Sequence, residues 1–339
     1  MRSLRASGVS VVGCNDDRFI LKNSDAERNY LIPPRGHRRR IATLRQILQT
    51  DEIDLVIPVS DDDVAELSRA RSRLRGHLFL PRQSVIALCQ DKYLASAFLR
   101  GKGIPAALTY AVKSLTDLNK IFRRLRRGRS DRVWCRVRNG AGAFGAAPVA
   151  SAAQAANWIA YWRDMRGTPV RAFTLSEYLP GRDFGCQSVW HDGELFLIKT
   201  YERLSYLTSG SRASEVSSVA ALAKTVFEPD VVETCTAAIR ALDRRASGVF
   251  SVDLKQDAAG VACVTEINAG RFSSATNIFD FTGKQNMAGT YVRVALGEPA
   301  GIGERYDFVE DHYMLRDIDA LPQIFRAEEF FDAILEPAS

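Results

Sequence analysis

Short apolar runs alternate with helical patterns in the first quarter of the chain. Val9–Gly13 and Asp54–Ser60 are such runs, and apolar segments of this length suit strands buried on both faces of a parallel sheet. Ile41–Leu48 and Val64–Leu74 instead repeat their apolar residues at the period of a helix. The pattern predicts a small parallel α/β domain over residues 1–85.

Residues 86–178 predict a second unit that combines helices with strands. Asp91–Arg100 and Ser151–Met165 carry amphipathic helical patterns. Arg132–Arg138 alternates like a strand and runs directly into Asn139–Gly145, a loop with three glycines.

Alternation typical of antiparallel strands dominates the rest of the chain, and we predict a third unit over residues 179–339. Asp192-Gly193, between two alternating segments, is a strong hairpin signal. Tyr201–Ser218 is polar, rich in serine and without period, so we predict a mobile loop there. The other predicted elements are strands at Ala172–Leu179, Phe184–His191 and Glu194–Thr200 and helices at Val231–Leu242 and Gln285–Leu296.

Two of the alternating segments, Gly248–Lys255 and Val264–Arg271, are separated by a short turn and predict a hairpin. The hairpin carries Asp253, Glu266 and Asn268. Side chains two apart on a strand share a face, so Glu266 and Asn268 point the same way. Three such oxygen donors suit Mg²⁺, with Mn²⁺ as an alternative, and either ion can share its shell with nucleotide phosphates. Taken alone, the triplet is equally compatible with a solvated strand end.

Composition argues against several classes of protein. The six cysteines are scattered, with no CxxC or Cys/His cluster, which argues against a disulfide scaffold or a zinc site and fits free thiols in a reducing cytosol. No stretch approaches the roughly 18 uninterrupted apolar residues of a membrane span, and the N-terminus does not read as a signal peptide. We therefore expect a cytoplasmic protein with no membrane partner.

Charge is distributed unevenly along the chain. Residues 1–150 hold 28 Lys and Arg against 14 Asp and Glu, a net charge of +14, whereas residues 151–339 carry −8. The densest basic run, Arg123–Arg132, lacks the interleaved aromatic residues of single-strand nucleic-acid binders. A solvated helix end explains this run more simply. An anionic small molecule is a more economical partner than nucleic acid.

Two further segments carry candidate chemistry. Arg136 lies at the end of a strand, before Gly140 and Gly142, and such a loop lets backbone N–H groups and a cation approach phosphates. The GxGxxG spacing that ends at Gly145 is weak evidence by itself, because no acidic residue follows near twenty positions on. Glu177–Asp183 (EYLPGRD) has an acid on each side of a Pro-Gly turn, which suits either an adenosine site or a solvated surface turn.

These segments, in this order, resemble the motifs of the ATP-grasp superfamily. The similarity covers roughly residues 9–300 and looks closest to the carboxylate–amine ligase and carbamoyl-phosphate-synthetase-like branch. Each motif is weak alone, but five in the same order are specific. The resemblance implies an α+β ATP-grasp fold, in which the N-terminal domain precedes two lobes with antiparallel sheets. The matching stretches are DKYLASAFLRGKGIP, RVWCRVRNGAGAFG, SEYLPGRDF, GVFSVDLK and VTEINAGRF.

The resemblance also implies a role for each matching residue. Asp253, Glu266 and Asn268 fall at the family's Mg²⁺ positions. Catalytic stabilisation of the transferring group falls to Arg271, with Lys199 or Arg203. Residues implied in ATP binding are Lys92 and Arg136 at the phosphates, Gly140 and Gly142 in the covering loop, Glu177 and Leu179 at adenine and Asp183 at the ribose.

The implied activity is that of an ATP-dependent ligase that forms C–N bonds. It activates a small-molecule carboxylate as an acyl phosphate and joins it to an amine, which requires positioning and electrostatics of the protein rather than a nucleophile. Arg136 stands for the family's Lys, and Asp183 and Asp253 stand where Glu is usual, with charge retained. Because the chain opens in a helix-like segment, the first sheet is expected to lack the family's first strand. Two alternative functions stay open, namely a non-catalytic ATP-binding paralogue and a basic nucleic-acid-binding protein. The oligomeric state is also open, with a homodimer as one possibility.

Overall fold

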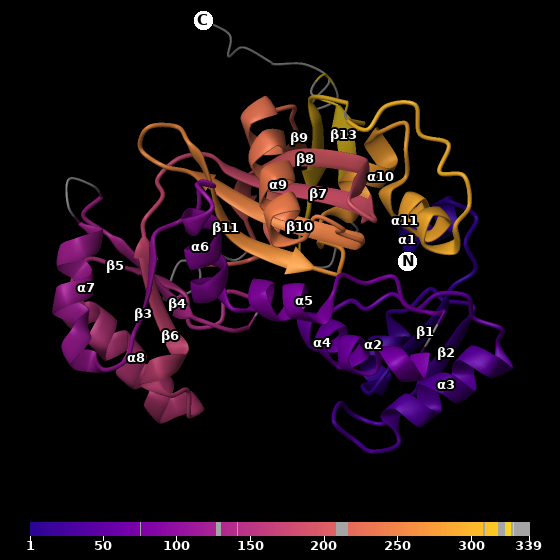
Figure 1. Cartoon of the computed structure of the whole chain (residues 1–339), viewed down its shortest axis with the longest axis horizontal. Helices are drawn as coiled ribbons and strands as arrows, with labels where there is room; N and C mark the ends of the chain where they lie inside the picture. The colour runs from indigo at the N-terminus through magenta and orange to yellow at the C-terminus, as the bar shows by residue number, and fades with distance from the viewer. Residues whose placement is uncertain are drawn as a thin grey trace, which may run out of the picture.

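The computed structural model describes residues 1–74, 76–126, 130–140, 142–207, 216–307, 309–317, 323–326 and 328. Across these ranges the strands form three sheets, of two, four and seven strands (Figure 1). A small parallel sheet comes first and two antiparallel sheets follow, which confirms the predicted fold class.

The two-stranded sheet belongs to the N-terminal segment. Its strands, β1 (Val12–Asn15) and β2 (Arg28–Leu31), are parallel. The helices predicted at Ile41–Leu48 and Val64–Leu74 are confirmed, the second with a break before its last turn. The helical elements of this segment are α1 (Arg2–Ala6), α2 (Arg18–Lys22), α3 (Arg40–Thr50), α4 (Asp61–Arg69) and the 3₁₀ helix η1 (Arg71–Leu74).

The strand predicted at Asp54–Ser60 is wrong, because no strand covers these residues. Leu55 and Ile57 pack instead on the buried cluster around Met287 and Tyr291. The apolar run therefore reflects burial against a distant helix and not pairing in a sheet.

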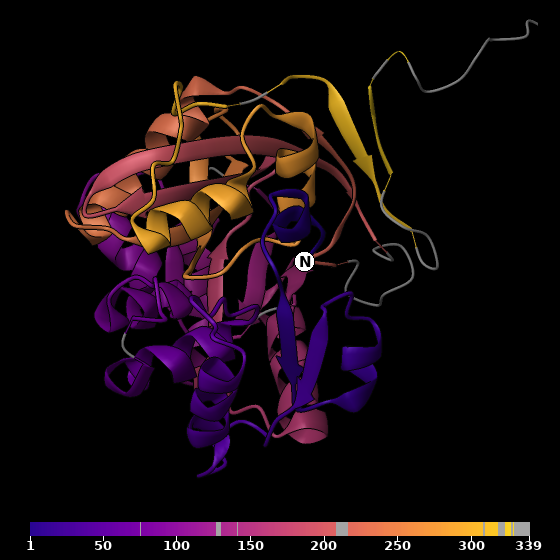
Figure 2. The same ribbon diagram turned by 90° about the vertical axis from the view of Figure 1, so that its right-hand side faces the viewer.

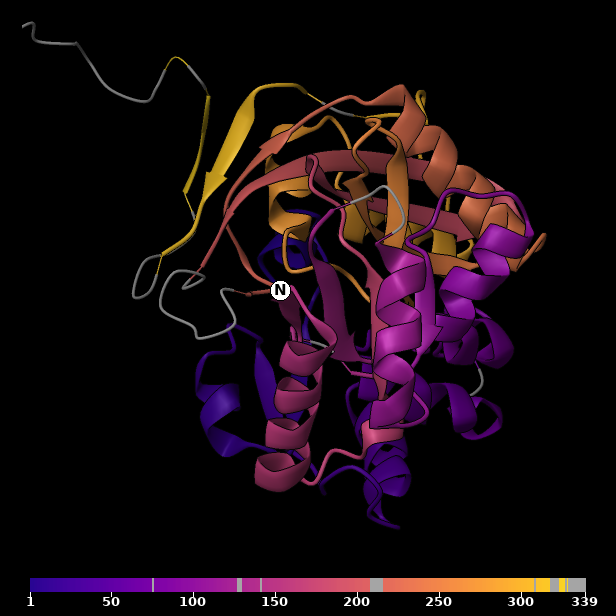
Figure 3. The same ribbon diagram turned by 90° about the vertical axis from the view of Figure 1, so that its left-hand side faces the viewer.

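The four-stranded sheet has the order β3-β6-β4-β5, and β4 carries Arg136. Helices α7 and α8 pack on it and close its own core (Figure 3). Side-chain caps fix two helix starts that the sequence predicts: Asp91 accepts from the N–H groups of Tyr93 and Leu94, and Ser151 accepts from that of Gln154. The elements here are α5 (Gln83–Gln90), α6 (Lys92–Gly101), β3 (Thr109–Ala111), η2 (Leu115–Asp117), α7 (Leu118–Leu125), β4 (Val133–Val137), β5 (Ala147–Val149), α8 (Ala152–Arg166), η3 (Val170–Ala172) and β6 (Phe173–Glu177).

The seven-stranded sheet has the order β11-β10-β7-β8-β9-β12-β13. The predicted turn at Asp192-Gly193 is confirmed, and both residues have the positive φ of a tight hairpin turn. The elements here are β7 (Asp183–His191), β8 (Glu194–Tyr206), β9 (Ala220–Thr225), α9 (Pro229–Leu242), β10 (Gly248–Gln256), β11 (Ala262–Ala269), α10 (Thr276–Thr282), α11 (Met287–Leu296), β12 (His312–Leu315) and β13 (Gln323–Arg326).

One face of the central strands β8, β7, β10 and β11 is apolar. Phe184, Phe250 and Leu254 on it belong to the same buried cluster as Cys235 and Ile239 of α9. Since strand side chains alternate, the residues between them are directed to the opposite face. That opposite face carries polar side chains, and the candidate site lies on it.

The mobile loop predicted at Tyr201–Ser218 is wrong in its first part. Tyr201–Tyr206 continues β8, which pairs with β7 on one side and β9 on the other. The prediction was wrong because this part of β8 lacks apolar alternation: Glu202 and Arg203, which point to opposite faces of the sheet, are both charged and ion-paired. Residues 208–215 lie outside the described part of the chain.

The N-terminal helix packs against helices from the last quarter of the chain. Helix α1 lies beside α10 and α11 (Figure 2), and Asn286 Nδ2 donates to the carbonyl of Ser3 at 2.8 Å. Among the described residues, no helix has both the length and the hydrophobicity required to cross a membrane.

Candidate functional site

The β10–β11 hairpin presents three oxygen donors on the polar face. The predicted hairpin is confirmed: β10 and β11 are antiparallel, with Asp253 directly opposite Glu266 and Ser251 opposite Asn268. A bulge follows Asp253, where the register shifts. Because opposite residues share a face, Asp253, Glu266 and Asn268 all face the same side of the sheet.

Two cationic side chains, Lys92 of helix α6 and Arg136 of strand β4, lie close to the Glu266 carboxylate. Lys92 Nζ lies 3.3 Å from Glu266 Oε1, and Arg136 NH1 lies 3.5 Å from Glu266 Oε2. The Lys92 side chain is buried, and Arg136 is nearly so. One carboxylate is therefore shared by two positive charges at the junction between the four-stranded and the seven-stranded sheets.

Helix α6 and strand β4 hold these two cations in place. Lys92 is the first residue of α6, its Nζ donates to the carbonyl of Gly140 at 2.5 Å, and its backbone N–H donates to the carbonyl of Arg138. Arg138 in turn pairs with Asp91, the cap of the helix. On β4, Arg136 NH2 donates to the carbonyl of Thr265 at 2.7 Å.

Arg136 is in a costly position for a cation. Burial lowers its pKa, and Glu266 and Asp253 oppose that shift. Its Nε is buried with no hydrogen-bond partner in the described structure. Buried donors are nearly always satisfied in proteins, so an orphaned N–H here is suited to an anionic ligand.

The glycine loop follows β4 directly. Gly140 and Gly142 have φ of 126° and 72°, in the region that favours glycine. Space for a side chain is open at both, whereas a Cβ at Gly145 would meet Val137 and Phe173. Gly145 thus anchors the loop against the sheet, and Gly140 and Gly142 leave its backbone exposed beside Lys92.

Arg203 of β8 occupies the middle of the polar face. Its NH1 donates to Asp183 Oδ1 at 2.8 Å, and its NH2 donates to Tyr201 Oη at 3.0 Å and to Asp253 Oδ1. Burial disfavours the charged form, but Asp253, Tyr201 and Asp183 outweigh it and hold the pKa of Arg203 well above its usual value. The other oxygen of Asp183 accepts from Tyr206, so both oxygens of the residue expected at the ribose already have protein partners.

Arg271 links the hairpin to the N-terminal segment. Its Nε donates to Asp61 Oδ1 at 2.6 Å, and its NH2 donates to Asn268 Oδ1 at 2.6 Å. Burial disfavours its charge, but Asp61 keeps the pKa of Arg271 above its usual value. Arg271 thus lies beside Asn268, one of the three oxygen donors, and its expected role in stabilising the transferring group stays a prediction.

Lys199 lies on the same face but serves a different purpose. Its Nζ donates to the carbonyls of Phe279 and Gln285 and pairs with Asp307 at 2.8 Å. The Lys199 side chain is 2% exposed, and its ammonium group holds the segment between α10 and α11 in place. The catalytic role expected for Lys199 has no support in this geometry.

The segment expected at adenine connects the two antiparallel sheets. Glu177, at the end of β6, is buried, and its carboxylate accepts from the backbone N–H of Leu108 at 2.7 Å. Leu179 packs with Ala107 and Cys263. Gly181 lies so close to Gln256 that a Cβ would meet its backbone. Both expected residues therefore shape the connection between sheets.

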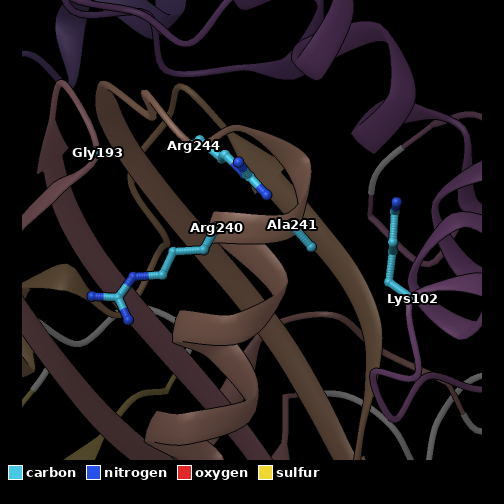
Figure 4. A pocket seen from close by; sticks show the side chains of 5 residues that line it. All are labelled: Lys102, Gly193, Arg240, Ala241 and Arg244. Atoms are coloured by element: carbon cyan, nitrogen blue, oxygen red, sulfur yellow. The ribbon is translucent and has the colours of Figure 1, made fainter.

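A hollow of about 440 Å³ lies elsewhere. It is lined by Lys102, Gly193, Arg240, Ala241 and Arg244. Figure 4 shows that the three cationic side chains do not converge on one point. A much smaller cavity at Lys92 and Glu266 lies between α6 and β11. We therefore place the candidate site by side-chain chemistry and not by cavity size.

Several residues that shape the site were not predicted from the sequence. Asp91, Arg138 and Asp61 position the cations, and Tyr201 lies across Gly185 on the polar face. The Asp before an amphipathic helix was the one detectable signal, because Asp is a preferred cap.

Comparison with solved structures identifies the fold. The sequence matches no family model and no curated protein. The chain is similar in structure to the L-amino acid ligase of Bacillus licheniformis (TM-score 0.67, 14% identity, 92% of this chain and 74% of that one). It is also similar to biotin carboxylase of Campylobacter jejuni in a β-γ-ATP complex (0.69, 14%, 92% and 71%). A third similar structure is carboxyaminoimidazole ribonucleotide synthase of Aspergillus clavatus complexed with ATP (0.67, 16%, 93% and 77%).

These similarities cover nearly the whole chain. The chain therefore has the ATP-grasp fold that its motifs resemble. At 14–16% identity the similarity establishes the fold alone.

Proposed function

We propose that the protein is an ATP-dependent ligase that activates a small-molecule carboxylate as an acyl phosphate and joins it to an amine. The observation that carries the proposal is the convergence of Lys92 and Arg136 on Glu266, beside an exposed glycine loop. Cations that share one carboxylate can transfer to phosphate oxygens when a nucleotide enters. The similar solved enzymes support the proposal at the level of fold.

The donor set fits one divalent cation on the Glu266 side of the hairpin. Glu266 and Asn268 supply hard oxygen donors, and nucleotide phosphates and water can complete the shell, as Mg²⁺ prefers. No group of three or more acidic, His or Cys side chains is arranged as a complete metal cage in the described ranges. A Mg²⁺ ion held by Glu266 and Asn268 would supply positive charge to the phosphate groups during transfer.

The protein's own residues then have distinct tasks. Lys92 and Arg136 hold and neutralise the phosphates, and the loop at Gly140 and Gly142 offers backbone N–H groups above them. Arg271 lies next to Asn268, where it can stabilise the oxygen that leaves or attacks. Small carboxylates and amines are the proposed substrates.

A screen for substrate-dependent ADP release tests the proposal. Amino acids and other small carboxylates are supplied with ATP and Mg²⁺, singly and in pairs, with Glu266→Gln as the matched inactive control. The proposal expects ADP release that depends on both a carboxylate and an amine. Release at an unchanged rate in the Glu266→Gln protein would contradict it.

One observation favours a second candidate, a nucleotide-binding protein without catalysis. Asp253 and Asp183, expected at metal and ribose, are both bound by Arg203. That candidate predicts ATP binding with no ADP release for any substrate pair.

A further inference from the structure

Arg203 forms the centre of a charge cluster on the polar face, and Lys255 Nζ lies at its edge, 3.9 Å from Asp183 Oδ2. The cluster comprises Arg203 on β8, Asp183 on β7 and Asp253 on β10, three neighbouring strands. Arg203 also donates to the carbonyl of Phe184 and to Tyr201, so both terminal nitrogens are fixed by neutral partners as well as by acids. The guanidinium bridges two carboxylates in the position where a divalent ion could otherwise do so.

The contacts of Arg203 differ in kind from those around Glu266. Arg203 makes charge-assisted hydrogen bonds to both acids, which are among the strongest polar contacts in proteins. Lys92 and Arg136 instead stand 3.3 and 3.5 Å from Glu266. Glu266 can therefore exchange its cations for a metal, whereas Asp253 Oδ1 is already held by a buried arginine whose two terminal nitrogens are both hydrogen-bonded.

We propose that Arg203 is a built-in cation that takes the place of a second divalent metal ion, so that the nucleotide-loaded site holds one metal, bound on the Glu266 and Asn268 side. The inference rests on the proposed function, since it concerns the same nucleotide site. It assigns Asp253 and Asp183 to holding Arg203. The fixed guanidinium contributes positive charge beside the phosphates in every state of the enzyme.

Counting bound Mn²⁺ by electron paramagnetic resonance tests the inference without any measurement of activity. The full-length protein is titrated with Mn²⁺ in the presence of saturating β,γ-imido-ATP. The wild type is expected to bind one Mn²⁺ per chain. Arg203→Met removes the cation from between two carboxylates and is expected to bind two, whereas Arg203→Lys keeps a charge and is expected to bind one.

A matched control loses an arginine that lies outside the cluster. Arg182 pairs with Glu202 and Glu228, and Arg182→Met should leave the count at one. Should Arg203→Met fail to fold, Asp253→Asn provides a second test, because the count should remain one if Asp253 is no metal ligand.

Two Mn²⁺ in the wild type, one in folded Arg203→Met, or none in Asp253→Asn would each overturn the inference. Calorimetry with β,γ-imido-ATP separates this from failure of the proposed function. Nucleotide that binds with two metals overturns the inference alone, and absence of any nucleotide binding overturns both.

Discussion

Replacement of Arg136 by Met would remove one of the two cations that share Glu266. Met preserves most of the apolar length of the side chain, so the change isolates the guanidinium. In the unliganded protein, Lys92 still neutralises Glu266, and the main loss is the bond to the carbonyl of Thr265. That loss costs about 1 kcal/mol of unfolding free energy, and relief of the buried charge offsets part of it.

The effect on ATP should be larger than the effect on stability. A charge-assisted bond to phosphate contributes about 1.5–3 kcal/mol, which corresponds to roughly 10- to 150-fold weaker ATP binding. Adenosine carries no phosphate, so its affinity should change little. Arg136→Lys keeps the charge and should recover part of the affinity for ATP.

Calorimetric titration of ATP and adenosine into each variant separates these effects. Arg245→Met is the control, since Arg245 is exposed and pairs with exposed Asp192. Equal losses of affinity for ATP and adenosine would refute a phosphate contact and leave Arg136 a purely structural role.

Three further predictions concern residues of the same face. Glu266→Gln is nearly isosteric, so thermal melts should show a folded protein while substrate-dependent ADP release is lost; normal release would exclude Glu266 as a metal ligand. Lys199→Met leaves Asp307 without its cation and should lower the unfolding free energy, measured in urea, by about 3–5 kcal/mol. The affinity for ATP should not change. Loss of turnover without loss of stability would instead indicate a catalytic role for Lys199. Gly185→Ala places a methyl group against the Tyr201 ring and should lower the unfolding free energy by about 1–3 kcal/mol. Gly303 has open space around it, so Gly303→Ala should leave the unfolding free energy unchanged. Equal effects of the two changes would contradict the contact between Gly185 and Tyr201.

Local patterns in the sequence were sufficient for the hairpin and its three donors. Alternation in β10 and β11 depends on neighbours in the chain, and the turn between them sets the register. The helix at Lys92 was likewise predictable, because its cap and its amphipathic pattern are adjacent in sequence.

Contacts between distant segments account for what the sequence could not predict. Arg203 and Asp253 are fifty residues apart and meet only because β7 lies between their strands. The sequence shows Lys199 only as a cation near the candidate site, because the Phe279 and Gln285 carbonyls that bind it lie about eighty residues further along the chain. The run at Asp54–Ser60 has the hydrophobicity of a strand, but it packs on a cluster that includes Met287 and Tyr291, more than two hundred residues away in the sequence.

Unfolding in urea with and without ATP and Mg²⁺ tests the central claim most directly, namely that this face of the fold binds a metal–nucleotide complex. At about 100 times the dissociation constant, ATP with Mg²⁺ should raise the unfolding free energy of the wild type by roughly 2.7 kcal/mol. Chelation of the metal and the Glu266→Gln change should each reduce that gain. An unfolding curve that does not move at millimolar ATP and Mg²⁺ would contradict the account.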